Sequence, residues 1–208
     1  MPDSSEIPYL LNLLDDDSEE IRDRIREALA GFGPVLEKEI WPYRHLLDSE
    51  KSAQMEALYR TFRIRAFEQT WPGWLDEGGY AVPLETAFSS LSRLDFGYSR
   101  PALSDLIDDL AEQFLALGFR CNSQALMHFL FQTKRMAPPQ QAYYEPLNSN
   151  LVHVIESRAG IQISLSAIAI LTGNRLGIEL FGLNIPGHFM LMATDTPAPH
   201  VLDPFSQG

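Results

Sequence analysis

The residues of this chain that could carry chemistry lie mainly in the final third of its 208 residues. His188 and Asp203 are the leading pair, because an imidazole oriented by a carboxylate is the base half of a nucleophilic triad. The other polar candidates in this stretch are Asn148, Asn150, Arg158 and Gln162. Whether these side chains meet depends on the strands and helices that carry them.

Three short strands are predicted after Gly177, where the hydrophobic period changes from 3.6 to 2 residues. They cover residues 179–185, 188–193 and 200–203. A turn over 194–199 joins the last two strands and sets their register.

The register decides whether the histidine and the aspartate face each other. A symmetric six-residue loop over 194–199 pairs residues whose numbers sum to 393, so Met190 lies opposite Asp203. His188 is then the diagonal neighbour of Asp203 on the same face, within reach of a His–carboxylate contact. A slip of one residue would separate them. The same contact would also serve as a structural hydrogen bond at a sheet end, so both roles stay open.

Helical periodicity covers most of the chain before these strands. The segment 163–175 is nearly all apolar, which predicts a helix buried on most sides. A buried helix followed by an antiparallel sheet is an α+β arrangement. Further helices are predicted at about 7–14, 21–29, 34–47, 50–70, 83–93, 103–116, 122–133 and 148–158.

The acidic start of the chain is predicted to form a separate helical cap. Its first two helices, with an acidic turn between them and a closing Gly33-Pro34, resemble one HEAT repeat. The segment Trp71 to Gly79 is rich in Trp, Gly and Pro and breaks the helical pattern. We therefore expect a cap over residues 1–75 and a second domain over residues 76–208.

Composition excludes several classes of function. The net charge of −12 and the pI near 4.7 disfavour binding to nucleic acid, whose phosphates an acidic surface repels. The N-terminus has no signal-peptide pattern and no apolar run is long enough to span a bilayer, so we expect a cytoplasmic protein without membrane contact. One cysteine allows no internal disulfide. The spacing of His153, His188 and His200 matches no metal site, and we expect no metal or cofactor.

Five ordered motifs identify a family resemblance. The chain resembles the SirB-type branch of the transglutaminase-like superfamily, whose core is related to papain-like cysteine proteases, and the resemblance covers about residues 83–208. The motifs that carry it are Asn148-Ser149-Asn150-Leu151, the run from Arg158 to Ser166, Leu176-Gly177-Ile178, Pro186-Gly187-His188-Phe189 and Leu202-Asp203-Pro204-Phe205.

The resemblance implies a triad that lacks its nucleophile. Active transglutaminase-like enzymes place a cysteine at the start of the buried helix, where the helix N-terminus favours the thiolate. His188 matches the family's histidine and Asp203 its aspartate, but the thiol position falls at or next to Gln162. The SirB-type branch usually has proline there, so Gln162 departs from that branch as well.

No other residue is an obvious replacement for the thiol. Ser164 should point away from Gln162, and Ser166 lies one turn deeper, where we expect its hydroxyl to bind the backbone carbonyl four residues earlier. Cys121 precedes a helix, a position that can activate a thiol, but a small buried residue is the commoner role.

The polar residues of the first motifs have structural interpretations. Asn148 is expected to be a helix N-cap, and Arg158 to reach carbonyls at the end of that helix or to pair with a carboxylate. Contact of Asn148, Asn150, Arg158 and Gln162 with a bound segment is the alternative.

Two hypotheses follow. The first is a non-catalytic module that binds a protein or peptide segment around Gln162, His188 and Asp203. The second is a hydrolase or acyl transferase in which His188 acts as base, Asp203 orients it, and the nucleophile is unidentified. Family members usually continue beyond the segment 203–208, so we expect a short member or a fragment, and an edge exposed there could form an oligomer.

Overall fold

The computed structural model describes residues 3–71, 81–97 and 99–206. The chain forms two compact units, Met1–Pro72 with Phe96–Ser99 and Gly73–Asp95 with Arg100–Gly208. The predicted boundary at residues 75 and 76 lies outside the described residues. Among the residues described, no helix is both long enough and apolar enough to cross a bilayer.

The first unit is helical, as its apolar periodicity predicts. Its helices are α1 (Ile7–Asn12), α2 (Glu19–Ala30), α3 (Leu36–Ile40) and α4 (Ser49–Thr70). The continuous helix predicted over 34–47 is wrong: α3 is short and lies between two 3₁₀ segments, Gly33–Val35 and Trp41–Leu46. Each 3₁₀ segment has a proline in its first turn, where the missing N–H and the fixed φ favour a new start.

The buried face of α2 is narrow. Ile25 and Leu29 are buried, whereas Ile21, one turn before Ile25, is 40% exposed. The buried residues of the cluster are Ile7, Leu11, Leu14, Ile25, Leu29, Phe32, Leu36, Ile40 and Met55. This core belongs to the first unit alone.

A buried ion pair joins α3 and α4. The Arg63 guanidinium donates to both carboxylate oxygens of Glu37, at 2.6 and 3.1 Å, and also pairs with Glu56 at 2.8 Å. The Arg63 side chain is only 9% exposed. Gly97 approaches this pair with φ +56°, and a Cβ there would lie 2.1 to 2.4 Å from the Glu37 and Arg63 side chains.

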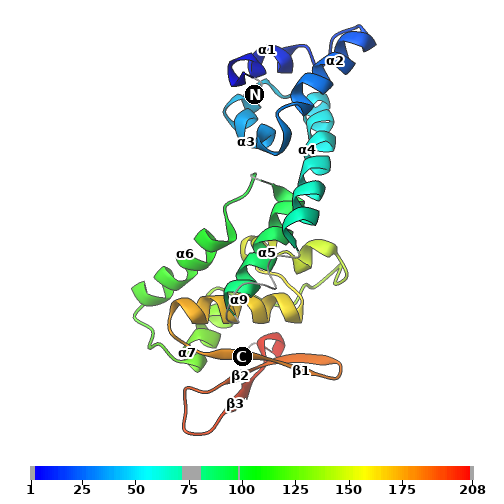
Figure 1. The fold of residues 1–208 in the computed structure, drawn as a ribbon. Coiled ribbons are helices and arrows are strands. Elements are labelled where there is room, and N and C mark those ends of the chain that lie inside the picture. The colour runs from blue at the N-terminus through cyan, green and yellow to red at the C-terminus, as the bar shows by residue number, and fades with distance from the viewer. Residues whose placement is uncertain (1–2, 72–80, 98, 207–208) are drawn as a thin grey trace. The chain divides into compact units, whose positions relative to one another are not determined.

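The second unit contains the predicted α+β core (Figure 1). Its helices are α5 (Ala81–Phe96), α6 (Leu103–Ala116), α7 (Ser123–Met127), α8 (Leu151–Ser157) and α9 (Gln162–Arg175). Every residue of α9 from Ser164 to Gly173 is buried, as its apolar sequence predicts. The helix predicted over 122–133 changes after α7 to a π-helix, His128–Thr133.

The sheet has three antiparallel strands in the order β1-β2-β3. They are β1 (Leu180–Ile185), β2 (His188–Ala193) and β3 (His200–Leu202). β1 and β2 are joined by Pro186-Gly187, and the φ of +78° at Gly187 suits the third position of a type II turn. The pairs Leu191–Leu202 and Ala193–His200 confirm the predicted register of β2 and β3.

Helix α9 packs against both β1 and β2 and against α6 and α8, so it is enclosed by the helices on one side and the sheet on the other (Figure 1). Its first residue, Gln162, contacts His188 and Phe189 at the start of β2. The position of α9 therefore determines what lies beside His188.

Substitution of Gly97 tests the role of its close approach to the ion pair. Gly33→Ala is the matched control, since Gly33 also has a positive φ (+62°) but faces open space. We expect Gly33→Ala to lower the free energy of unfolding by about 1–2 kcal/mol, the cost of a left-handed alanine. Gly97→Ala should cost roughly 1 kcal/mol more, because the buried ion pair must move. Equal losses in urea unfolding would contradict this.

Candidate functional site

Gln162, His188 and Asp203 meet at one place in the second unit. Gln162 is the first residue of α9, His188 is the first residue of β2, and Asp203 follows β3. His188 Nε2 lies 3.0 Å from Asp203 Oδ2, and His188 Nδ1 lies 2.9 Å from Gln162 Nε2. The predicted contact between His188 and Asp203 is therefore present in the structure.

The amide of Gln162 bridges α9 and β2 through two hydrogen bonds. Its Oε1 accepts from the backbone N–H of Phe189 at 3.1 Å, so its Nε2 is the atom that faces His188. An amide nitrogen only donates, so His188 Nδ1 must be the acceptor. Asp203 accepts the proton on Nε2. The contacts are thus satisfied by a neutral imidazole protonated at Nε2.

Asp203 accepts hydrogen bonds from three groups. They are the His188 ring, the backbone N–H of Phe205 at 2.9 Å and the hydroxyl of Ser206 at 2.6 Å. Burial by itself raises the pKa of the Asp203 carboxyl, but the bonds from Ser206, His188 and Phe205 outweigh it and hold the pKa below its ordinary value of 3.8. The carboxylate thereby joins β2 to the 3₁₀ turn Pro204–Ser206.

The arrangement has a base and an orienting carboxylate but no nucleophile. Within the described part of the chain, the hydrogen-bond partners of the His188 ring are Gln162 and Asp203, and neither is a thiol or a hydroxyl. The Nδ1 lone pair, which would take a proton from a nucleophile, is already engaged by the amide. The carboxamide of Gln162 is not a nucleophile toward an acyl group in water near neutral pH.

The other candidate nucleophiles lie elsewhere. Ser164 points away from His188, as predicted, and donates to the carbonyl of Asn148 at 2.8 Å. Ser166 is fully buried, and its Oγ has no hydrogen-bond partner among the described residues, so the predicted bond to the Gln162 carbonyl is wrong. The buried role expected for Cys121 is also wrong, because this residue is exposed.

The prediction that Asn148 is the N-cap of α8 is wrong. The N-cap of α8 is Asn150, whose Oδ1 accepts from the N–H groups of Val152 and His153 at 3.1 and 3.4 Å. Asn148, predicted as that cap, lies in the 3₁₀ turn Pro146–Ser149 one step before it. Its amide instead donates to the carbonyls of Ala142 and Tyr143 at 2.9 and 3.1 Å. The reason is that the chain bends at Asn150, whose extended backbone starts the helix two residues later than predicted.

Asn150 and Arg158 both have structural positions. Asn150 is 2% exposed, and its side chain also contacts Ser92 at 3.0 Å and Asp95 at 2.6 Å. Arg158 ends α8 in the left-handed conformation (φ +61°), and its backbone carbonyl accepts from the N–H of Ala137. Its side chain is exposed, and no ion pair or hydrogen bond of its guanidinium is found among the described residues. The predicted role of its side chain at the helix end is therefore not observed.

Sequence reasoning missed a second polar cluster in this unit. Ser123 donates to Asp195 from its backbone N–H at 2.5 Å and from its hydroxyl at 3.0 Å, and its Oγ lies 3.0 Å from His200 Nε2. Ser123 is 1% exposed, and the carboxylate binds the serine rather than the far side of the imidazole. In a catalytic triad the imidazole lies between the carboxylate and the hydroxyl, so this arrangement is a different one. The cluster fastens the β2–β3 loop to the start of α7.

No sequence signal pointed to that cluster, because Ser123 is 72 residues from Asp195. The described residues contain no group of three or more His, Cys, Asp or Glu side chains able to hold a metal ion. His153, His188 and His200 do not form one.

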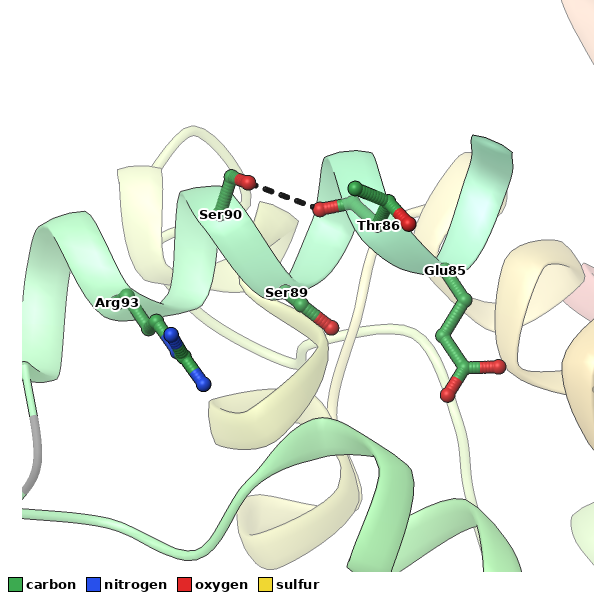
Figure 2. Close-up of a pocket in the computed structure, with 5 residues that line it drawn as sticks. All are labelled: Glu85, Thr86, Ser89, Ser90 and Arg93. Carbon is green, nitrogen blue, oxygen red and sulfur yellow. Dashed lines mark hydrogen bonds between the residues drawn. The ribbon is translucent and has the colours of Figure 1, made fainter. Parts of the chain in front are cut away.

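A polar hollow of about 440 Å³ runs along α5 and contains none of these side chains. Figure 2 shows Glu85, Ser89 and Arg93 on one side of the helix, spaced by one turn. Glu85 is held by Arg175 through two bonds of 2.7 and 2.8 Å, and the Ser90 hydroxyl donates to the Thr86 carbonyl. Of the lining residues, Ser90 thus binds Thr86 and Glu85 binds Arg175 of α9, and none of them belongs to the Gln162 site.

A family model described as "Transglutaminase-like superfamily" matches residues 99–208, more than half of the chain. The chain belongs to the transglutaminase-like superfamily. The matched residues include all of α6 to β3 and the three side chains of the site.

The chain is also similar to parts of several curated proteins. The UPF0162 protein of Xylella fastidiosa (strain Temecula1) is 40% identical over 84 residues, which are 40% of this chain and 30% of that protein. The UPF0162 protein of Vibrio cholerae is 27% identical over 84 residues, 40% of this chain and 31% of the relative. F-box only protein 21 of mouse is 31% identical over 67 residues, 32% of this chain and 11% of the relative.

The similarity thus spans less than a third of the length of each of these relatives. No solved structure matches the chain. The transglutaminase-like assignment therefore rests on the family model and these partial sequence matches.

The protonation pattern of His188 can be tested with an isosteric variant. In the wild-type domain we expect ¹⁵N spectra to show a neutral ring protonated at Nε2. Gln162→Glu keeps the acceptor for Phe189 but replaces the donor at Nδ1 with a second carboxylate oxygen. With acceptors on both sides, both ring nitrogens must donate, so we expect an imidazolium spectrum at neutral pH. A ring protonated at Nδ1 in the wild type would contradict the assignment.

The lowered pKa of Asp203 predicts a pH dependence of stability. A carboxyl with a lower pKa in the folded state stabilises that state above its ordinary pKa and loses the effect as pH falls through the lowered value. Asp203→Asn should therefore reduce the free energy of unfolding at pH 6 to 7, and the difference from wild type should shrink toward pH 3. Glu112→Gln, at an exposed position of α6, is the control and should show little difference at either pH. A difference that grows on acidification would contradict the sign.

Proposed function

We propose that this transglutaminase-like domain is non-catalytic and binds a protein or peptide segment at the Gln162–His188–Asp203 site. The observation that carries the proposal is the Gln162 amide, which stands at the start of α9 and donates to His188 Nδ1 at 2.9 Å. In a catalytic arrangement a thiol at the helix start would give its proton to this nitrogen.

The amide also resists conversion to an active arrangement by small movements. Its second bond, from the Phe189 N–H at 3.1 Å, keeps Oε1 against the backbone of β2. Rotation away from His188 would break both hydrogen bonds, each worth about 1 kcal/mol. Gln162 thus stabilises the closed network in which His188 has no free lone pair.

The His188–Asp203 pair has a structural use that needs no nucleophile. Asp203 Oδ2 accepts from the His188 ring and from the Ser206 hydroxyl, and its Oδ1 accepts from the backbone N–H of Phe205. The pair therefore orders the turn that follows β3 and sets the position of Phe205. We infer that it acts here as a pair of positioning residues for a binding surface.

The site is open to a partner. The side chains of His188 and Asp203 are 32% and 21% exposed, so a segment laid across the end of the sheet can reach them. We place this binding module in a cytoplasmic protein of the SirB-type branch, with the first unit as a HEAT-like cap. The five ordered motifs of the sequence and the helical pair α1 and α2 support that placement.

Hydrolysis or acyl transfer is the alternative, and the 3.0 Å contact between His188 and Asp203 is the observation that favours it. It requires a nucleophile from water or from a substrate, and displacement of the Gln162 amide from Nδ1. Because the two functions make opposite demands on Gln162, one set of variants separates them.

Turnover of p-nitrophenyl acetate and of a glutamine-containing peptide amide tests the proposal. We expect the wild-type rate to equal that of the His188→Ala variant, since the imidazole has no free lone pair. A rate that His188→Ala abolishes and Cys121→Ser leaves unchanged would establish the enzyme and overturn the proposal.

Installing a thiol provides the positive control. Gln162→Cys in a Cys121→Ser background should create a reactive cysteine at the helix start, alkylated by iodoacetamide roughly ten-fold faster than when His188→Ala is added, for a thiol pKa lowered by about one unit. Equal rates would mean that position 162 is not the thiol position, and the inference from Gln162 would fail.

A further inference from the structure

A continuous row of aromatic rings lies beside the Gln162 site. The His188 ring contacts Phe205 (centroids 6.4 Å apart, planes at 84°), Phe205 contacts Tyr143 (6.3 Å, 90°), and Tyr143 contacts Tyr144 (5.3 Å, 86°). All three contacts are edge-to-face. We call His188, Phe205, Tyr143 and Tyr144 the aromatic row. It joins residues that are some 60 positions apart in the sequence.

The two tyrosines are held by a buried side chain. Asn148, only 5% exposed, donates to the carbonyls of Ala142 and Tyr143, and the N–H of Glu145 returns to the Ala142 carbonyl at 2.9 Å. Ala142 has a φ of +50°, a conformation that non-glycine residues rarely adopt. The hydrogen bonds of Asn148 and Glu145 therefore stabilise this turn, because the backbone conformation of Ala142 is unfavourable by itself.

Phe205 is held in a corresponding way from the other side. Its N–H donates to Asp203, which in turn binds the His188 ring. The backbone at Phe205 and at Tyr143 is thus bound by the side chains of Asp203 and Asn148. A binding surface that is ordered in advance loses less entropy when a partner binds.

The row is exposed where a partner would touch it. Tyr144 is 93% exposed and Tyr143 is 39% exposed. Tyrosine is among the residues that contribute most binding energy at protein interfaces, because its ring is large and has few rotatable bonds. The faces of these rings carry negative electrostatic potential and attract cations.

The segments that supply the row carry negative charge, as the faces of the rings do. Residues 136–157 and 176–208, which supply the whole row, contain no lysine or arginine. They contain five acidic residues, which are Glu145, Glu156, Glu179, Asp195 and Asp203. The cations that flank these segments are Lys134, Arg135, Arg158 and Arg175. Of these, Arg175 is bound by two carboxylates, and Glu156 within the first segment is paired with Arg100 at 3.2 Å.

Arg175 is also distant from the row. It ends α9, whose first residue, Gln162, contacts His188. Thirteen helical steps of 1.5 Å place the two ends of α9 about 20 Å apart. Its charge therefore lies far from the His188 end of the row.

We propose that the aromatic row is the docking surface for an arginine- or lysine-bearing segment of a partner protein, with the cationic group over the Tyr143 and Tyr144 rings and Glu145 beside it. The inference rests on the proposed binding function and specifies the chemistry of the partner. A rigid aromatic surface in an acidic setting favours a cation over an acidic or a purely apolar segment.

Titration of the full chain with defined peptides tests this inference. The probe is a capped decapeptide of glycine and serine with two adjacent arginines, and its partner peptide carries glutamine in their place. Binding is followed through ¹³C resonances of the tyrosine and phenylalanine rings. We expect the arginine peptide to shift the signals of Tyr143, Tyr144 and Phe205 saturably, and to bind at least five-fold tighter than the glutamine peptide, as a cation–π contact predicts.

Variants locate the binding. Tyr144→Ala should weaken the arginine peptide about five-fold without changing the charge of the chain. Tyr9→Ala is the matched control, since Tyr9 is an exposed tyrosine (73%) of the first, acidic unit. It should leave the affinity unchanged. Circular dichroism should show that both variants are folded.

The outcomes separate this inference from the proposed function. Equal affinity for both peptides at the row would overturn the preference for a cation and leave a binding surface. Loss of affinity in Tyr9→Ala but not in Tyr144→Ala, or no binding of either peptide, would overturn the inference. The proposed function is judged independently by the turnover assays with His188→Ala, which need no peptide partner.

Discussion

Burial of α9 is the constraint on which the second unit depends. Ten consecutive residues of this helix, from Ser164 to Gly173, are shielded from solvent by the other helices and by β1 and β2. Burying its larger apolar side chains contributes about 1.5–3 kcal/mol each, which fixes the helix against the sheet. Its first turn emerges from the core at Gln162, whose side chain binds His188 and Phe189 at the start of β2.

This geometry is the basis of the proposed non-catalytic function. The helix start, the imidazole and the carboxylate lie together at one end of the sheet. Under the proposal, the side chain at the helix start decides what the other two groups do. A thiol at the helix start would exchange a proton with His188, whereas the Gln162 amide donates a hydrogen bond and keeps its proton. The same two partners then become part of a fixed network.

The polar network also organises the surface around it. Asp203 binds the backbone N–H of Phe205, and Asn148 binds the backbone carbonyl of Tyr143. These hydrogen bonds position the two residues that carry the aromatic rings. A second cluster, Ser123 with Asp195 and His200, fastens the β2–β3 loop in the same unit. Buried polar groups of this kind are costly unless paired, and when paired they define one conformation. The loops of this domain are therefore ordered by side chains rather than by sheet pairing.

The sequence alone determined the features that depend on local spacing. Apolar periodicity predicted the buried helix from residue 163, and the symmetric loop over 194–199 predicted the register that brings His188 near Asp203. It also predicted that Ser164 turns away from the site. Each of these follows from a repeat of 3.6 or 2 residues or from a loop length, all of which are properties of neighbouring residues.

The tertiary structure decided the contacts between residues distant in sequence. The helix expected over 34–47 breaks at its prolines, and the N-cap of α8 is Asn150 rather than Asn148. Ser166 makes no bond to the Gln162 carbonyl, and Cys121 is exposed rather than buried. The two bonds of the Gln162 amide, the Ser123 cluster and the aromatic row were also invisible to pattern. Their distances depend on how packed helices and strands meet, and periodicity carries no information about that.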